Sequence, residues 1–137
     1  MRSARLLAAC GAGLALAVIG QVPAVSVAVP DKWVGVWSVH AGGATVRANG
    51  TITMTYQAYY KRDHGLPSFP EIRMKVTSVH GNRLIGRVIG QRESPIEVGS
   101  RFTVRQRTPG IWIKFSGSKK TFRFCDRWHR ERGDCGA

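Results

Sequence analysis

The stretch from Trp33 to Tyr60 constrains the fold more than any other part of the chain. Its last part, residues 51–60, alternates between a mostly apolar set of side chains and a set dominated by threonine. The apolar set is Ile52, Met54, Tyr56, Ala58 and Tyr60. Such alternation is typical of a half-buried β-strand, and the preceding Asn49-Gly50 is a strong hairpin signal. We therefore expect an antiparallel β-meander in which Trp37, on the first strand, anchors the core.

Similar alternation returns along the rest of the chain. It covers residues 71–80, 101–107, 111–115 and 121–125, and a further strand is expected over 83–91, where the inward parity is ambiguous. Turns that contain Gly or Pro separate most of these segments, and no useful helical period follows the N-terminal leader. About eight strands favour an all-β domain, a single small antiparallel up-and-down β-barrel, because closure removes exposed sheet edges. An open β-sandwich is the alternative.

The first 28 residues have the pattern of a secretory signal peptide. Arg2 and Arg5 precede an apolar run from Leu6 to Gly20, and Ser26-Val27-Ala28 fits the small-residue cleavage pattern. An uncleaved anchor is the alternative, but a membrane span needs about 20 apolar residues. We predict a secreted, extracellular protein with no transmembrane segment after cleavage. Residues 29–125 would form the barrel and residues 126–137 a C-terminal tail.

Two cysteines, Cys125 and Cys135, remain after cleavage. In an exported chain an even number of cysteines indicates a disulfide, which here would tie down the tail. The alternative is a zinc site that uses His129 as well, but only three ligands are present where structural zinc takes four. We therefore predict the disulfide, with no metal and no cofactor.

Catalytic patterns are missing from the sequence. Nucleophilic catalysis needs a base beside the nucleophile, and glycoside hydrolysis needs paired carboxylates. The eight acidic residues are scattered, and Asp63-His64 is the one acid–histidine neighbour pair, in a Pro- and Gly-containing loop. We therefore predict a binding protein and not an enzyme.

The first quarter of the predicted domain resembles a known group of barrels. The Gly35-x-Trp37 opening, the Asn-Gly hairpin and the Thr-x-Thr-x-Tyr strand that ends at Tyr56 are similar to the calycins, which include lipocalins, fatty-acid-binding proteins and avidins. The whole chain also looks like small secreted proteins of actinobacteria. The calycin resemblance implies a small hydrophobic ligand inside the barrel. Avidins place a polar biotin contact two residues after the tryptophan, where this chain has Val39, so biotin is not implied.

Side chains that face inward by parity could line such an interior site for a small apolar or amphipathic ligand. They are Trp37, Met54, Tyr56, Tyr60 and Phe122. The Lys61–Pro70 loop is long enough to gate it. The alternative is that these side chains simply fill the core, as small barrels require.

Basic side chains that face outward by parity form the second candidate site. The chain carries a formal net charge of +13, and only Arg2 and Arg5 of its basic residues belong to the leader. On three neighbouring strands the outward set is Arg101, Arg105, Arg107, Trp112, Lys114 and Arg123. Arginines beside an exposed aromatic ring can bind polyanions, such as anionic polymers of the cell envelope, with no specific nucleic acid implied. The alternative is that these charges only solvate the barrel.

Overall fold

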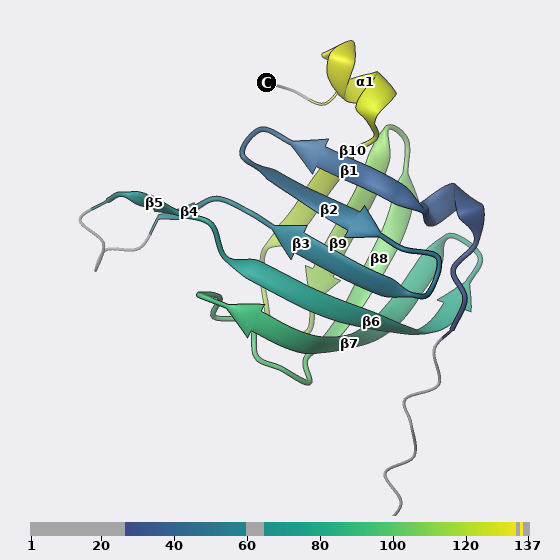
Figure 1. The fold of residues 1–137 in the computed structure, drawn as a ribbon, viewed down its shortest axis with the longest axis horizontal. Coiled ribbons are helices and arrows are strands. Elements are labelled where there is room, and N and C mark those ends of the chain that lie inside the picture. The colour runs from purple at the N-terminus through teal and green to yellow at the C-terminus, as the bar shows by residue number, and fades with distance from the viewer. Residues whose placement is uncertain (1–26, 60–64, 134, 136–137) are drawn as a thin grey trace, which may run out of the picture.

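The computed structural model describes residues 27–59, 65–133 and 135, and these residues form a closed antiparallel β-barrel (Figure 1). Its eight strands are β1 (Gly35–Val39), β2 (Gly42–Val46), β3 (Thr51–Thr55), β6 (Glu71–His80), β7 (Arg83–Arg92), β8 (Arg101–Arg107), β9 (Gly110–Phe115) and β10 (Thr121–Cys125). A short 3-10 helix, η1 (Asp31–Trp33), precedes β1. The prediction of an all-β up-and-down barrel is confirmed, and the open sandwich is wrong.

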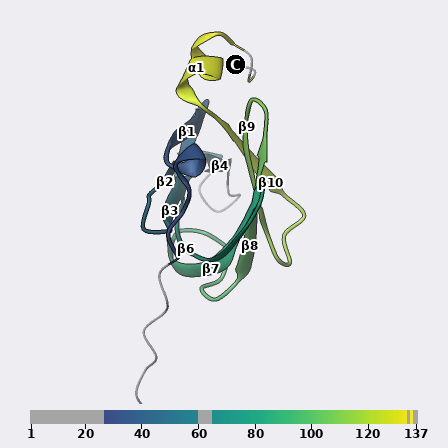
Figure 2. The ribbon, with the colours of Figure 1, turned by 90° about the vertical axis from the view of Figure 1, so that its right-hand side faces the viewer.

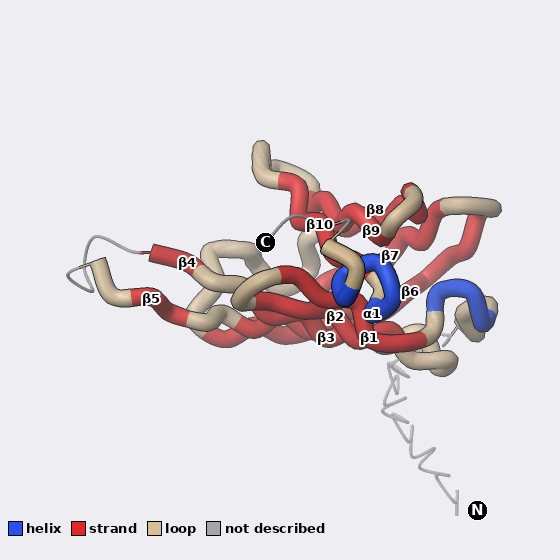
Figure 3. Tube along the Cα trace, turned by 90° about the horizontal axis from the view of Figure 1, so that it is seen from above, coloured by secondary structure: helices blue, strands red, loops and turns tan. Residues whose placement is uncertain are grey.

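Each barrel strand pairs with the next barrel strand along the chain, and β1 meets β10 at the pair Ser38–Cys125 to close the barrel. Strands β1–β3 and strands β8–β10 form its two sides, and the long strands β6 and β7 join them (Figures 2 and 3). The register of β6 against β7 shifts between Arg73 and Met74 and between Val76 and Ser78. Such bulges bend a strand, which suits β6 and β7 for turning the sheet between the two sides.

The alternation predicts most of the core correctly. Ile52, Met54 and Tyr56 are buried, as are their counterparts on the other strands. The Nε1–H of Trp37 donates to the carbonyl oxygen of Trp33 at 2.9 Å, which fixes the core anchor against η1. The interior of an eight-stranded barrel is just wide enough for its inward side chains to fill or for one small ligand.

The ambiguous parity of β7 is decided by packing. Leu84 and Val88 are buried, whereas the side chain of Ile89 points outward and is 51% exposed. Gly86 shares the inward parity, and a β-carbon there would collide with the carbonyl oxygen of Lys75 and the ring of Phe102. The inward face of β7 therefore carries a glycine because the phenylalanine of the next strand fills that space.

The long strand predicted over residues 51–60 is interrupted. β3 ends at Thr55, and β4 (Ala58–Tyr59) pairs with β5 (Pro67–Ser68) in a separate hairpin that projects from the barrel (Figure 1). The register explains the break, because Thr55 pairs with Glu71, the first residue of β6. The segment predicted as a loop therefore contains β5. Tyr60 and the Asp63-His64 pair lie outside the described residues.

Candidate functional site

The outward side chains of β7–β10 form rows across the sheet. In one row Arg83 of β7 pairs with Arg105 of β8, which pairs with Trp112 of β9, which pairs with Arg123 of β10. In the next row Thr103 pairs with Lys114 and Lys114 with Thr121. The burial patterns of β8–β10 confirm the outward parity predicted for their basic side chains. For Arg83 on β7 no parity was predicted.

At two positions between β7 and β8, an arginine of one strand lies directly opposite an arginine of the other. Arg83 pairs with Arg105, and Arg87 pairs with Arg101. Like charges directly opposite each other destabilise an antiparallel sheet. Arg87 also donates from Nη1 to the carbonyl oxygen of Gly99 at 3.0 Å. The outer surface of these two strands therefore concentrates positive charge at a cost to stability.

Trp112 is the centre of a second cluster of cations. The guanidinium carbon of Arg107 lies 4.5 Å from the centroid of the indole, and that of Arg123 lies 4.3 Å from it. Arg107 belongs to β8 and Arg123 to β10, so the two cations reach the ring from the two strands that flank β9. A cation over an aromatic face gains about 0.5–1 kcal/mol at an exposed site. These contacts hold both guanidiniums beside the ring.

A groove of about 500 Å³ on the outside of the barrel is lined by most of these residues, and Arg123 adjoins it through its contact with Trp112. Its lining comprises Arg83, Arg101, Thr103, Arg105, Arg107, Trp112, Lys114, Phe115, Ser116 and Thr121. A second hollow, of about 390 Å³, adjoins it at Arg83, Arg105 and Arg107. Within the described part of the chain, none of the basic side chains of this groove forms an ion pair with a carboxylate. We call the surface formed by Arg83, Arg101, Arg105, Arg107, Trp112, Lys114 and Arg123 the basic face.

The structure brings together all six outer residues that the sequence singled out and adds Arg83. Sequence reasoning missed Arg83 because the parity of its strand was ambiguous. Arg83 immediately follows the turn at residues 81–82, in register with Arg105. Knowledge of the pairing between β7 and β8 would have been needed to find it.

The described interior candidates are packed in the core. Met54 is fully buried, and Trp37, Tyr56 and Phe122 are at most 8% exposed. The rings of Tyr56 and Phe122 lie 4.7 Å apart, and that of Phe122 lies 5.8 Å from Phe115 in an edge-on arrangement. These contacts describe a filled core at this position, and the predicted interior ligand stays a prediction.

Polar groups gather over this aromatic cluster. The hydroxyl groups of Tyr56 and Ser94 form a hydrogen bond of 3.1 Å. The Nζ of Lys120 lies 5.2 Å from the ring centroid of Tyr56 and 4.9 Å from that of Phe122. The loop between β7 and β8 and the turn between β9 and β10 therefore both contact the tyrosine.

The C-terminal segment contains a helix that the sequence analysis did not expect. Helix α1 (Arg127–Glu131) follows β10, and the carboxylate of Asp126 caps it by accepting from the backbone N–H of His129 at 2.8 Å. This hydrogen bond, opposed in part by desolvation, lowers the pKa of Asp126. The sequence shows no helical period here because five residues are too few to display one. The acidic residue before the helix was the available signal.

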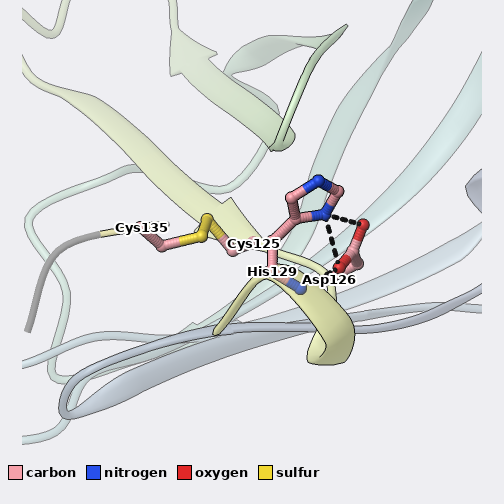
Figure 4. Close-up of a disulfide and its surroundings, with 4 residues drawn as sticks. All are labelled: Cys125, Asp126, His129 and Cys135. Atoms are coloured by element: carbon pink, nitrogen blue, oxygen red, sulfur yellow. Dashed lines mark hydrogen bonds and ion pairs between the residues drawn. A yellow bond between two sulfur atoms is a disulfide. The ribbon is translucent and has the colours of Figure 1, made fainter. Parts of the chain in front are cut away.

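Cys125 and Cys135 form the predicted disulfide, with their Cα atoms 6.2 Å apart (Figure 4). His129, the third ligand of the zinc alternative, instead contacts Asp126, with Nδ1 2.8 Å from Oδ2. Among the described residues, His, Cys, Asp and Glu side chains form no group of three or more that could hold a metal ion. In the same residues, no helix has the length and apolar character needed to span a membrane.

Comparison of the chain with protein-family models, with curated proteins and with solved structures finds no match.

Proposed function

We propose that this chain is a secreted, non-enzymatic barrel of calycin-like type that binds anionic polymers through its basic face. The observation that carries the proposal is the register of β7–β10, which lines up arginines with one another and with Trp112 around one groove. Polymers of the cell envelope are the partners that fit a cationic exported protein, because a field of this sign attracts polyanions.

The alternative is that the charges only keep the barrel soluble. Solvation alone requires no particular arrangement, and mixed charges serve it well. The basic face instead places arginines directly opposite arginines, with no carboxylate ion-paired to its basic side chains among the described residues. An arrangement that reduces stability in this way is expected where a ligand supplies the missing charge.

The experiment that tests the proposal compares two triple variants of equal net charge. In the first, Arg101, Arg105 and Arg123 of the basic face become alanine. In the second, Arg47, Arg73 and Arg92 become alanine; these residues do not belong to the basic face, and Arg92 pairs with Glu71. We expect the first triple to elute from immobilised polyphosphate and heparin at clearly lower salt than the second. Equal elution of the two would refute a specific face.

The interior ligand of the calycin resemblance is the second hypothesis. A small apolar or amphipathic molecule would have to displace or separate Tyr56 and Phe122, whose rings are in contact. Binding at the basic face requires no such displacement.

A further inference from the structure

Trp112 is the aromatic residue of the basic face, and two roles are open to it. An aromatic side chain in a cationic groove can serve as a platform on which nucleic-acid bases stack. It can also hold neighbouring cations in place through its π-electrons. The two roles predict different ligands, because stacking requires a base and cation placement requires only an anion.

The contacts of the ring distinguish these roles. Both guanidinium carbons, of Arg107 and of Arg123, lie within 4.5 Å of the same ring centroid. They come from the strands on either side of β9, and the indole itself is only partly exposed. A stacked base would have to take the place of one of these arginines. It would then exchange one favourable contact for another and displace a cation from the groove.

The contacts with Trp112 also restrict the positions of the two guanidinium groups. An exposed arginine has high rotamer freedom and loses it when it binds. The two guanidinium carbons at Trp112 cannot be further apart than twice 4.5 Å, since both distances are measured to one centroid. A pair of cations held at this separation is partly organised before the ligand arrives, which reduces the cost of ordering them on binding.

We propose that Trp112 is a positioning residue which holds Arg107 and Arg123 for the oxyanions of a polymer, so that the basic face binds base-free polyanions as well as it binds nucleic acids of equal charge. This inference rests on the proposed function of the basic face. The ligand class is a linear polymer of phosphate or sulfate groups, recognised through charge-assisted hydrogen bonds from guanidinium groups.

The test measures the affinity of residues 29–137, in oxidised form, for two probes of matched charge: inorganic polyphosphate and a thymidine oligonucleotide. Wild type, Trp112→Leu, Trp112→Phe and Arg123→Ala are compared over a range of salt concentrations. Circular dichroism and thermal unfolding check that each variant is folded. If the leucine variant does not fold, the phenylalanine variant, which keeps an aromatic face, provides the comparison with wild type.

We expect Trp112→Leu to weaken binding of both probes by the same factor, about two- to five-fold, and Trp112→Phe to weaken it less. The slope of log affinity against log salt should stay unchanged in Trp112→Leu, because no phosphate contact is removed. In Arg123→Ala that slope should fall by about one.

Three results would overturn the proposal. Loss of oligonucleotide binding alone in Trp112→Leu would make Trp112 a stacking platform, and unchanged binding of both probes would remove it from the site. In either case the basic face would still bind polyanions, and the proposed function would stand. If wild type binds neither probe, the proposed function itself fails, and this inference fails with it.

Discussion

Arg83 on β7 lies directly opposite Arg105 on β8, and both side chains line the groove around Trp112. The pair is the feature of the basic face on which the proposed polyanion binding rests. Its two members repel each other in the free protein, and an anion between them would relieve that repulsion. Stability and binding should therefore respond in opposite directions when one of the two charges is removed.

Arg105→Gln should stabilise the barrel and weaken polyanion binding. Removing one member of a directly opposed like-charge pair relieves repulsion of about 0.2–1 kcal/mol, and the gain should shrink as salt screens the charges. Denaturant unfolding at low and high salt measures the first effect, and polyphosphate affinity measures the second.

Arg123→Gln is the matched control, because Arg123 lies opposite Trp112 and not opposite a cation. It should weaken binding without stabilising the fold. Equal unfolding free energies for Arg105→Gln and wild type at low salt would show that the pair of Arg83 and Arg105 does not lower the stability of the barrel.

Tyr56→Trp tests the interior-ligand hypothesis. Tyr56 is already in contact with Phe122 and hydrogen-bonded to Ser94, so a larger ring there would fill whatever space a ligand could use. Native mass spectrometry of residues 29–137, before and after denaturation, reports any small molecule that travels with the protein. The hypothesis predicts a released mass from wild type that Tyr56→Trp lacks. Equal uptake by Tyr56→Trp, or a wild-type protein with no released mass, would contradict an interior site.

Removal of the disulfide should loosen the C-terminal segment. The bond spans ten residues and encloses α1, whose five residues are too few for an isolated helix to be stable in water. Replacing both Cys125 and Cys135 by alanine should lower the free energy of unfolding by about 2–3 kcal/mol and leave the strands of the barrel intact. Urea unfolding of the variant and of wild type, each with and without reductant, measures the effect. Reductant should lower the free energy of unfolding of wild type only. If it leaves the wild-type value unchanged, the disulfide does not contribute to stability.

The cap of α1 should be sensitive to acid. The pKa of Asp126 is lower in the folded protein than its ordinary value, chiefly because the N–H of His129 donates to its carboxylate. The ionised cap therefore stabilises the fold above the unfolded pKa, about 4, and that contribution is lost as the pH falls through the lowered folded pKa. Asp126→Asn lacks the charge and should therefore lose less stability as the pH falls from the unfolded to the folded pKa of Asp126. An NMR titration of the Asp126 carboxyl that gives an ordinary aspartate pKa would contradict the effect.

The alternation of side chains was sufficient to predict the barrel and the outward direction of the basic residues on β8–β10. Strands β8–β10 alternate between large apolar residues and charges, so only one assignment of their faces avoids a buried arginine. Strand β7 was ambiguous because Ile85 and Ile89 are apolar yet point outward. Its inward row contains Gly86, which fits only because Phe102 of the next strand fills the space.

Pairing between strands carries the information that alternation lacks. The sequence does not reveal that Arg83 lies opposite Arg105, nor that Arg107 and Arg123 both reach Trp112. These relationships depend on register, which is set by turns and bulges in distant parts of the chain. The candidate residues could therefore be named from the sequence, whereas their arrangement around Trp112 and the groove beside it required the structure.

The most direct test of the basic face is the salt dependence of polyphosphate binding by wild type and by the triple variant with Arg101, Arg105 and Arg123 replaced by alanine. Each cation that contacts a phosphate contributes about one unit to the slope of log affinity against log salt. We predict that the triple variant loses about three units of slope and binds far more weakly, while the variant at Arg47, Arg73 and Arg92 keeps the wild-type slope. The same slope in all three proteins would show that binding arises from net charge alone and would contradict the proposed site.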